Sequence, residues 1–395
     1  MSSKKKQKRK VSEQHHAPDK SVLIFILAMA IFGAIMIYDA SVYKANQEPF
    51  NNQFHFLIQQ LVWLTIGGIL GLIVYMIDYR KILKASFPFL IATAILLILV
   101  LLVGEEINGS KRWFQFGSLP QIQPAEFAKL AIVMYFSSWF SNKEYSFNKF
   151  EDSFKKGFLK NLLPFLAILG AVALLILFEP DLGTAMIICV TAFLMFFLSG
   201  KDKAHRLGSF AVIPLAFVLG IIAIALEPYR ISRIKTYFDL IFKGQVGDPQ
   251  GSGYQMQQIL IGIGSGGFWG KGFGQSRQRF GYLVENTAFT DSTFAVLLEE
   301  LGLWGGALLI LSWVFFLLRG MKIALSATDK QGQFLATGIT VWLTCQAFFN
   351  MAANVGLIPL TGIPLPFLTY GGSSTIVTII AFALLLNVSK YTKNA

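Results

Sequence analysis

Long apolar blocks alternate with short polar segments along almost the whole chain. Each block holds roughly 17–25 residues with few charges, the length that an α-helix needs to cross the hydrocarbon core of a bilayer. The pattern therefore predicts an all-α polytopic membrane protein with ten transmembrane helices. The ten blocks lie near residues 21–43, 56–78, 85–104, 124–140, 161–178, 183–199, 209–226, 293–318, 332–355 and 373–390.

One polar segment interrupts this alternation. Residues 227–292 separate the seventh block from the eighth and are too many for a tight turn. Long polar connections between membrane helices are where functional residues gather. We expect a large extracytoplasmic loop here that carries the chemistry. Residues 1–20 form a disordered basic tail by composition, and residues 21–395 are expected to form a single transmembrane domain.

Composition and charge distribution orient these helices. The 395 residues are 54% hydrophobic and only 14% charged, against about 25% charged in soluble domains. With the N-terminus inside, the cytoplasmic segments hold 23 Lys and Arg residues and the outer segments hold ten. This bias predicts that both termini are cytoplasmic. The net charge of +12 is thus explained by membrane topology, and no nucleic-acid partner is expected.

The outer cations are concentrated in one place. Seven of the ten lie in the segment 227–292. Positive charge on the outer side opposes the usual bias, so it needs another cause. An anionic substrate at the outer leaflet would supply that cause.

Two sequence patterns do not match known metal-binding or cofactor-binding motifs. Cys189 and Cys345 lie within apolar blocks without a second thiol or a histidine nearby, so no metal or redox site is expected. The glycine-rich stretch GIGSGGFWGKGFG lacks the strand–helix context of a dinucleotide site, and Lys271 is followed by glycine rather than Ser or Thr, which excludes a P-loop. These glycines instead favour a folded loop in which backbones approach closely.

The stretch NGSKRWFQFGSLPQIQPAEFAKL carries charges into a membrane block. Pro124 and Glu126 form a good helix start, and Lys129 follows one turn later. The pair could neutralise itself at the helix mouth, or it could mark a functional site, since ionisable groups within spans are costly. Arg112 and Trp113 precede the helix and could bind a phosphate and a sugar or lipid face, or form part of an interfacial belt.

Two aspartates stand at the expected outer ends of helices. Asp181, in EPDLGT, could cap the following helix or contribute to an acidic outer site. Asp291 follows Thr290 at the start of the eighth block and could likewise be a cap or a general base beside the cationic loop. Glu285 lies six residues earlier and is the alternative base.

Seven motifs in order resemble the SEDS proteins (shape, elongation, division and sporulation), and among them the FtsW/RodA glycosyltransferases. They are NGSKRW, QPAEFAKL, EPDLGT, GSGYQMQQ, GSGGFWGKGFGQS, FTDSTFAVLLEELG and NVGLIPLTGIPLPFLTYGGSS. The resemblance covers residues 22–390. Three departures exist: Ser110 stands where the family has Ala, no Pro precedes Glu285, and no His precedes Thr290-Asp291.

The resemblance implies a polymerase of lipid II, the undecaprenyl-pyrophosphate-linked disaccharide-pentapeptide. Asp291 would deprotonate the GlcNAc 4-hydroxyl, which attacks C1 of MurNAc and expels the lipid pyrophosphate. A cationic site would stabilise that leaving group. The residues expected to bind substrate are Arg112, Trp113, Glu126, Lys129, Asp181, Arg230, Arg233, Gln255, Lys271, Arg277, Glu285 and Ser373.

The resemblance also implies partners and leaves alternatives open. A class B penicillin-binding protein transpeptidase is the expected partner, within the division machinery. The basic tail and the ending LLLNVSKY favour the FtsW-like division branch over RodA-like elongation. A divalent cation (Mg or Mn) bridging pyrophosphate and Asp291 is compatible with the sequence. A lipid II flippase and a catalytically idle scaffold remain alternatives from other functional classes.

Overall fold

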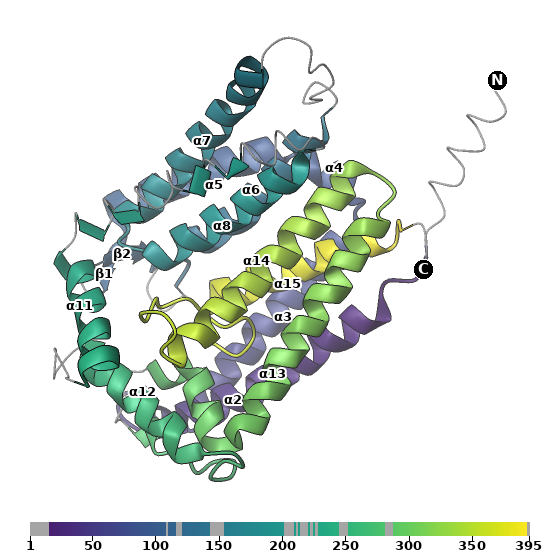
Figure 1. The fold of residues 1–395 in the computed structure, drawn as a ribbon. Coiled ribbons are helices and arrows are strands. Elements are labelled where there is room, and N and C mark those ends of the chain that lie inside the picture. The colour runs from purple at the N-terminus through teal and green to yellow at the C-terminus, as the bar shows by residue number, and fades with distance from the viewer. Residues whose placement is uncertain are drawn as a thin grey trace, which may run out of the picture.

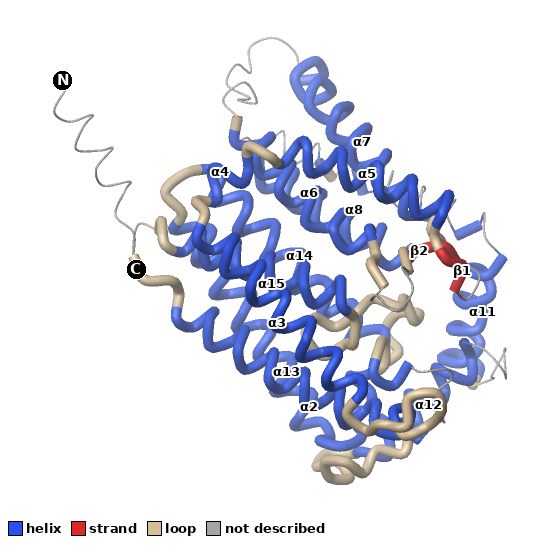
Figure 2. The backbone as a smooth tube through the Cα atoms, turned by 180° about the vertical axis from the view of Figure 1, so that it is seen from behind, coloured by secondary structure: helices blue, strands red, loops and turns tan. Residues whose placement is uncertain are grey.

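The computed structural model describes most of the chain as a bundle of long helices with one short hairpin (Figure 1). The described residues are 16–107, 110–115, 121–142, 154–200, 209–210, 212–213, 220–221, 224–225, 228–244, 252–280 and 287–392. The helical backbone satisfies its own hydrogen bonds, as a bilayer requires. Figure 2 shows that most of the described backbone is helical.

The elements follow one another in the order α2 (Lys20–Ala45), α3 (His55–Met76), α4 (Tyr79–Leu83), α5 (Ser86–Val103), β1 (Glu105–Ile107), β2 (Ser110–Trp113), α6 (Pro124–Ser141), α7 (Phe154–Phe178), α8 (Leu182–Ser199), α11 (Pro228–Lys243), α12 (Ser252–Gly266), η2 (Gln278–Phe280), η3 (Thr287–Phe289), α13 (Thr293–Ser326), α14 (Lys330–Asn354) and α15 (Gly372–Ser389). β1 and β2 pair antiparallel.

Every expected apolar block except the seventh corresponds to one of these helices. In the described part of the chain, seven helices are long and apolar enough to span a membrane, namely α2, α3, α5, α8, α13, α14 and α15. The seventh block, 209–226, lies mostly outside the described residues. The chain is therefore a multi-pass membrane protein, as predicted.

The expected loop 227–292 is not a simple loop. It contains the helices α11 and α12, which pack against each other, and α12 also packs on α13. α11 alternates cations with large apolar side chains, including Phe238 and the exposed Phe242. Such an amphipathic helix suits a membrane surface better than a span. Helical periodicity inside a polar segment was the signal that sequence analysis missed.

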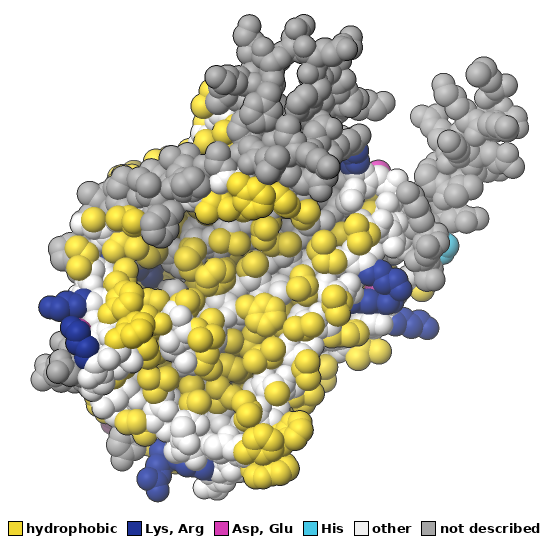
Figure 3. All heavy atoms as spheres, in the orientation of Figure 1, with side chains coloured by type: hydrophobic (Ala, Val, Ile, Leu, Met, Phe, Trp, Pro, Cys, Tyr) yellow, Lys and Arg dark blue, Asp and Glu magenta, His cyan; other side chains and the backbone are white. Residues whose placement is uncertain are grey.

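Helix α14 lies at the centre of the bundle. It packs against α6, α8, α13 and α15, whereas α3 packs mainly on α15 and α2 (Figure 1). In its apolar window 83% of residues are buried, against 17% for α3. The exposed apolar side chains of the outer helices cover much of the face in Figure 3, as expected where lipid is the solvent.

The two ends of the bundle are formed by different secondary-structure elements. The hairpin, α11 and α12 gather at one end, and α4 lies at the other, near the start of α2 and the end of α15 (Figure 1). The backbone N–H of His16 donates to the carbonyl of Lys390 at 3.0 Å, and the N–H of Asp19 donates to Ser389 Oγ at 3.0 Å. The beginning and end of the described chain therefore meet at the same end.

The glycine-rich loop after α12 docks onto a break in α13. Gly302 has φ +67° and interrupts the helical conformation. Around this break the loop donates Lys271 N–H to the Glu299 carbonyl at 3.0 Å and Gly272 N–H to the Glu300 carbonyl at 3.0 Å. Carbonyls that the break frees are thus satisfied by the loop, as membrane helices require.

The two glutamates at this break bind the same loop through their side chains. Glu299 is buried, pairs with Lys271 Nζ at 2.6 Å and accepts from Ser276 Oγ at 2.6 Å. Glu300 accepts from the Ser276 N–H at 3.0 Å. The acidic pair therefore holds the loop against α13.

The close approach of the loop to α13 predicts that position 270 tolerates only glycine. The φ of Gly270 is +78°, and a Cβ there would lie 2.1 Å from the Glu300 carbonyl oxygen. We expect Gly270→Ala to lower the free energy of unfolding by more than about 2 kcal/mol, through strain and overlap. The control Gly264→Ala, a helical position with no atom within 4 Å, should be neutral or stabilising by about 0.5–1 kcal/mol. Equal thermal midpoints in detergent would contradict this packing.

Candidate active site

The segment that carries Asp291 is held by hydrogen bonds from two directions. Asn350 Nδ2 and Asn354 Nδ2, both on α14, donate to the Asp291 carbonyl at 2.9 Å each. Thr369 Oγ1, from the loop before α15, donates to the Thr290 carbonyl at 2.8 Å. Both asparagines are buried. The backbone of Asp291 is thus fixed from the most buried helix of the bundle.

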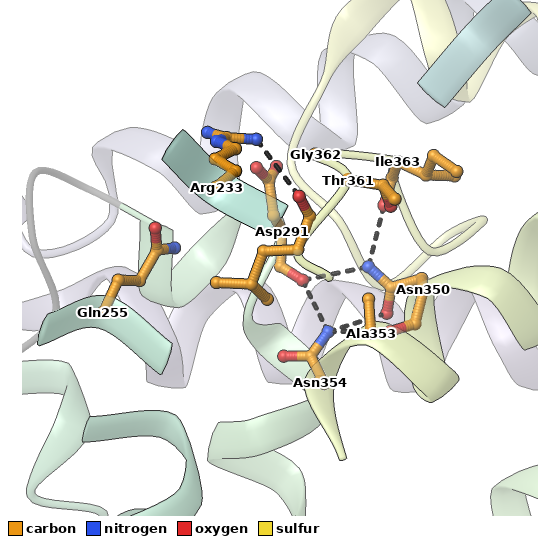
Figure 4. A pocket seen from close by; sticks show the side chains of 10 residues that line it. Arg233, Gln255, Asp291, Asn350, Ala353, Asn354, Thr361, Gly362 and Ile363 are labelled. Carbon is orange, nitrogen blue, oxygen red and sulfur yellow. Dashed lines mark hydrogen bonds between the residues drawn. The ribbon is translucent and has the colours of Figure 1, made fainter. Parts of the chain in front are cut away.

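The Asp291 carboxyl lies in a pocket between α11, α12, α14 and the loop before α15 (Figure 4). Arg233 of α11 lies beside it, and Gln255 of α12 lines the opposite wall. Gly362 lies next to the Asp291 carboxyl and has φ +69°, a backbone conformation that favours glycine. The structure therefore brings together three residues that the sequence selected: Asp291, Arg233 and Gln255.

Two opposing effects set the basicity of Asp291. Burial raises the pKa of the Asp291 carboxyl above its ordinary value, while the positive charges of Arg233 and Arg112 oppose this rise. Arg233 is itself anchored by donating Nη1 to the Leu360 carbonyl at 3.1 Å. The result is a carboxylate more basic than an ordinary aspartate, which suits a proton acceptor.

Arg112 is anchored by carbonyl groups. From β2 its Nε donates to the Glu179 carbonyl and its Nη2 to the Pro180 carbonyl, both at 2.6 Å. Trp113 follows it, with the guanidinium 5.9 Å from the ring centre. These neutral acceptors leave the charge of Arg112 uncompensated at its anchor point. A guanidinium held in this way is well suited to bind a phosphate.

Glu179 and Asp181 lie on the same turn and have different surroundings. Burial raises the pKa of Glu179 to about 9, helped by the charge of Asp181 and opposed by Arg112. Asp181 caps α8, accepting from the N–H and the Oγ1 of Thr184 at 2.9 Å each, and also from Gln123 Nε2 at 3.3 Å. The capping interpretation of Asp181 is thus confirmed, and Glu179 is protonated at neutral pH.

Asp291 itself is not a helix cap. The N-cap of α13 is Ser292, which makes no side-chain capping bond. The capping alternative that the sequence left open for Asp291 is therefore wrong. Its carboxyl faces Arg233 in the pocket instead (Figure 4).

Glu126 and Lys129 form a buried ion pair within α6. Lys129 Nζ lies 2.8 Å from Glu126 Oε1, and the side chains are only 3% and 2% exposed. Lys129 also donates to Gln346 Oε1 at 2.9 Å, and Gln346 Nε2 donates to the Pro364 carbonyl at 3.0 Å. The pair thus ties α6 to α14 and to the loop before α15, and it does not line the Asp291 pocket.

Three other residues that the sequence predicted to bind substrate make contacts within the protein instead. Arg230 is buried and donates Nη2 to the Leu177 carbonyl at 3.0 Å. Ser373 Oγ accepts from the Gln123 N–H at 3.0 Å, which fixes the start of α6. Lys271 pairs with Glu299, away from the pocket.

Two further residues that the sequence predicted to bind substrate are not placed in the pocket by the described structure. Arg277 is exposed in the loop after α12 and does not line the pocket. Glu285 lies outside the described residues.

Sequence analysis missed the two asparagines on α14. Asn350 and Asn354 stand one turn apart in the ninth apolar block. Polar side chains inside a membrane helix usually pair with a partner or mark a functional path. That spacing was the signal that could have found them.

No cluster of three His, Cys, Asp or Glu side chains that could hold a metal ion occurs within the described ranges. The charge of the Asp181 carboxylate acts on Asp291, and the oxygens of Asp181 already accept three hydrogen bonds.

The family assignment rests on a match over nearly the whole chain. Residues 19–394 match the FtsW/RodA/SpoVE family, described as "Cell cycle protein". The chain belongs to this family. Stage V sporulation protein E of Bacillus subtilis is 39% identical over 380 residues, covering 95% of this chain and 98% of that protein. The probable peptidoglycan glycosyltransferase FtsW of Legionella pneumophila is 36% identical over 375 residues, covering 94% and 90%.

Solved structures share the fold. A chain from a structure entitled "Structural coordination of polymerization and crosslinking by a peptidoglycan synthase complex" superposes with TM-score 0.74 at 26% identity, covering 96% of this chain and 99% of that one. The rod shape determining protein RodA of Thermus thermophilus gives TM-score 0.66 at 24% identity, with the same coverage. The helical architecture is therefore that of this family.

The ion pair of α6 generates a prediction on stability. Lys129→Met leaves the buried Glu126 charge without its partner, which should lower the free energy of unfolding by about 3–5 kcal/mol. Adding Glu126→Gln removes that charge and should restore most of the loss. Thermal unfolding in detergent measures both. A double variant no more stable than Lys129→Met alone would contradict mutual neutralisation.

Proposed function

We propose that this protein is a peptidoglycan glycosyltransferase that polymerises lipid II, with Asp291 as the general base. The observation that carries this proposal is the half-buried Asp291 carboxyl beside Arg233, in a pocket lined from α11, α12, α14 and the loop before α15. A carboxylate with raised basicity next to cations is the arrangement that sugar transfer to a hydroxyl from a pyrophosphate requires. The names of the FtsW relatives support the same activity.

In the reaction, Asp291 accepts the proton of the GlcNAc 4-hydroxyl of the acceptor. The oxygen then forms a bond to C1 of the donor MurNAc, and the bond from C1 to the lipid pyrophosphate breaks. The bonding electrons leave with the pyrophosphate, and the proton stays on Asp291 until water removes it. General-base assistance of this kind typically contributes ~10²–10⁴ in rate.

The departing pyrophosphate gains negative charge and needs cations placed in advance. Arg112 and Arg233 are the best placed of the predicted set, because both are anchored to carbonyl oxygens and both act electrostatically on Asp291. Lys271 has a carboxylate partner of its own, Glu299. We therefore assign the leaving-group site to Arg112 and Arg233.

A divalent cation would add Lewis-acid stabilisation of the pyrophosphate. Among the described side chains, Asp291 is the carboxylate that could contribute to holding such an ion. Mg²⁺ commonly uses one or two carboxylates together with substrate phosphate oxygens, so the residues fit an ion that arrives with its substrate. The chain's own steps in binding and proton transfer do not depend on it.

The proposed membrane orientation places the Asp291 end outside. The excess of Lys and Arg in the tail and in alternate connections favours both termini in the cytoplasm. The described termini meet at the end opposite the hairpin and α11. Ten helices in one domain, with residues 227–292 extracytoplasmic, complete the proposed topology. The substrate would then be met at the outer leaflet.

The proposed partner is a class B penicillin-binding protein transpeptidase. One structural neighbour comes from a peptidoglycan synthase complex, and the relatives named FtsW and stage V sporulation protein E favour division or sporulation over elongation. The flippase alternative gains no support. The pocket is lined in part from α11 and α12, which lie at one end of the bundle (Figure 1), whereas transporter sites lie near the midplane.

The experiment is polymerisation of purified lipid II by the full chain with its transpeptidase partner, followed on gels. Asp291→Asn preserves size but removes basicity, so the rate should fall by ~10²–10⁴ while folding and partner binding persist. The matched control is Asp239→Asn on α11, where the carboxylate pairs only with the exposed Lys243. Polymerisation by Asp291→Asn at the wild-type rate would move the role of base to Glu285.

A further inference from the structure

Among the side chains that line the pocket beside Asp291, two neutral residues each have a buried oxygen without a hydrogen-bond partner within the described ranges. These oxygens are Oδ1 of Asn354 and Oγ1 of Thr361. Both residues line the pocket, and Asn354 as a whole is only 1% exposed. A buried polar atom without a partner usually lowers the stability of the folded protein by about 1–3 kcal/mol. Atoms of this kind therefore indicate a position where a ligand can supply the missing hydrogen bonds.

The orientation of the Asn354 amide is fixed by its neighbours. Its Nδ2 donates to the carbonyl of Asp291 at 2.9 Å and to the carbonyl of Asn350 at 3.0 Å. Carbonyl oxygens can only accept, so the nitrogen must face them and the oxygen must face the other way. Figure 4 shows this oxygen turned away from the main chain of Asp291. Asn354 thus positions Asp291 with one side of its amide and presents an acceptor with the other.

Four other residues that line the pocket indicate which chemical group could bind there. Ala353, Leu360 and Ile363 supply apolar contacts, and the Thr361 hydroxyl can donate. The cavity has a volume of about 20 Å³, which admits a small group and is far below the ~300–1,000 Å³ of sites that enclose a whole ligand. A matching group has one N–H donor, one carbonyl acceptor and a methyl. A hydroxyl group or a water molecule would make no apolar contact with Ala353, Leu360 and Ile363.

We propose that this pocket binds the acetamido group of a reacting sugar. Its N–H donates to Asn354 Oδ1, its carbonyl accepts from Thr361 Oγ1, and its methyl contacts Ala353, Leu360 and Ile363. This inference rests on the proposed function and deepens it, because it makes N-acetylation of the substrate a recognised feature. Binding the acetamide here would fix the sugar ring relative to the Asp291 carboxyl.

Thr361→Val tests the subsite, because valine has the shape of threonine without the hydroxyl. In the lipid II assay with the transpeptidase partner, we expect KM to rise about 3- to 10-fold, the loss of one neutral hydrogen bond. The thermal midpoint should stay the same or rise, since the hydroxyl has no partner to lose. The matched control is Thr344→Val on α14. The Thr344 hydroxyl is likewise buried and without a partner in the described structure, but it does not line the pocket. This control should leave KM unchanged.

Both sugars of lipid II carry an acetamide, and two substrate variants distinguish them. One has glucose in place of GlcNAc, and the other lacks the acetyl group on the muramic sugar. Thr361→Val should add no further KM increase on the variant that lacks the bound acetamide, because the two changes remove the same hydrogen bond. Full additivity with both variants would overturn the subsite.

The outcomes separate this inference from the proposed function. If the wild-type chain makes no glycan from lipid II, the function fails and the subsite fails with it. If the wild type polymerises and Thr361→Val behaves like Thr344→Val, only the subsite is overturned. A selective KM increase in Thr361→Val supports both.

Discussion

The buried hydrogen bonds from α14 to the Asp291 carbonyl are the constraint on which the site depends. Helix α14 is the most buried of the seven candidate spans, so Asn350 and Asn354 have little freedom to move. Two donors on one carbonyl fix the backbone without touching the carboxyl. The reactive group can therefore remain in the pocket while its main chain is part of the core. Precise placement of this kind is what general-base catalysis needs.

The charges of the protein divide into two groups with different tasks. In one group each cation has a buried carboxylate partner: Lys129 with Glu126, Lys271 with Glu299, and Arg279 with Asp39. These pairs join helices or hold the glycine-rich loop. In the other group, Arg112 and Arg233 are anchored by carbonyl oxygens. Both arginines also act electrostatically on the Asp291 carboxyl, which places their positive charge at the proposed reaction site and narrows the list of substrate-binding cations.

The sequence predicted the helices well because membrane spans are encoded by length and apolarity alone, as α5 and α8 show. It also identified Asp291 and Gln255 through motifs, and Arg233 through the concentration of cations in residues 227–292; all three line one pocket. It did not predict α11 and α12 inside a polar segment. Nor did the sequence show that Arg233 lines the pocket whereas Lys271 pairs with Glu299 away from it, because the contacts of each cation come from elements distant in the sequence. Tertiary contacts of that kind, like those of Asn350 and Asn354, leave only a weak local signal.

The central claim is that Asp291 accepts a proton from a site that raises its basicity, and the pH dependence of kcat/KM for lipid II tests it directly. Burial raises the pKa of Asp291, so the active carboxylate is lost as pH falls through that raised value. We predict an acidic limb with its midpoint clearly above the ~3.9 of an ordinary aspartate, under conditions where circular dichroism shows an intact fold. A flat profile down to about pH 4 would contradict the account, because an ionisation at an ordinary or lower pKa cannot be that of this buried base.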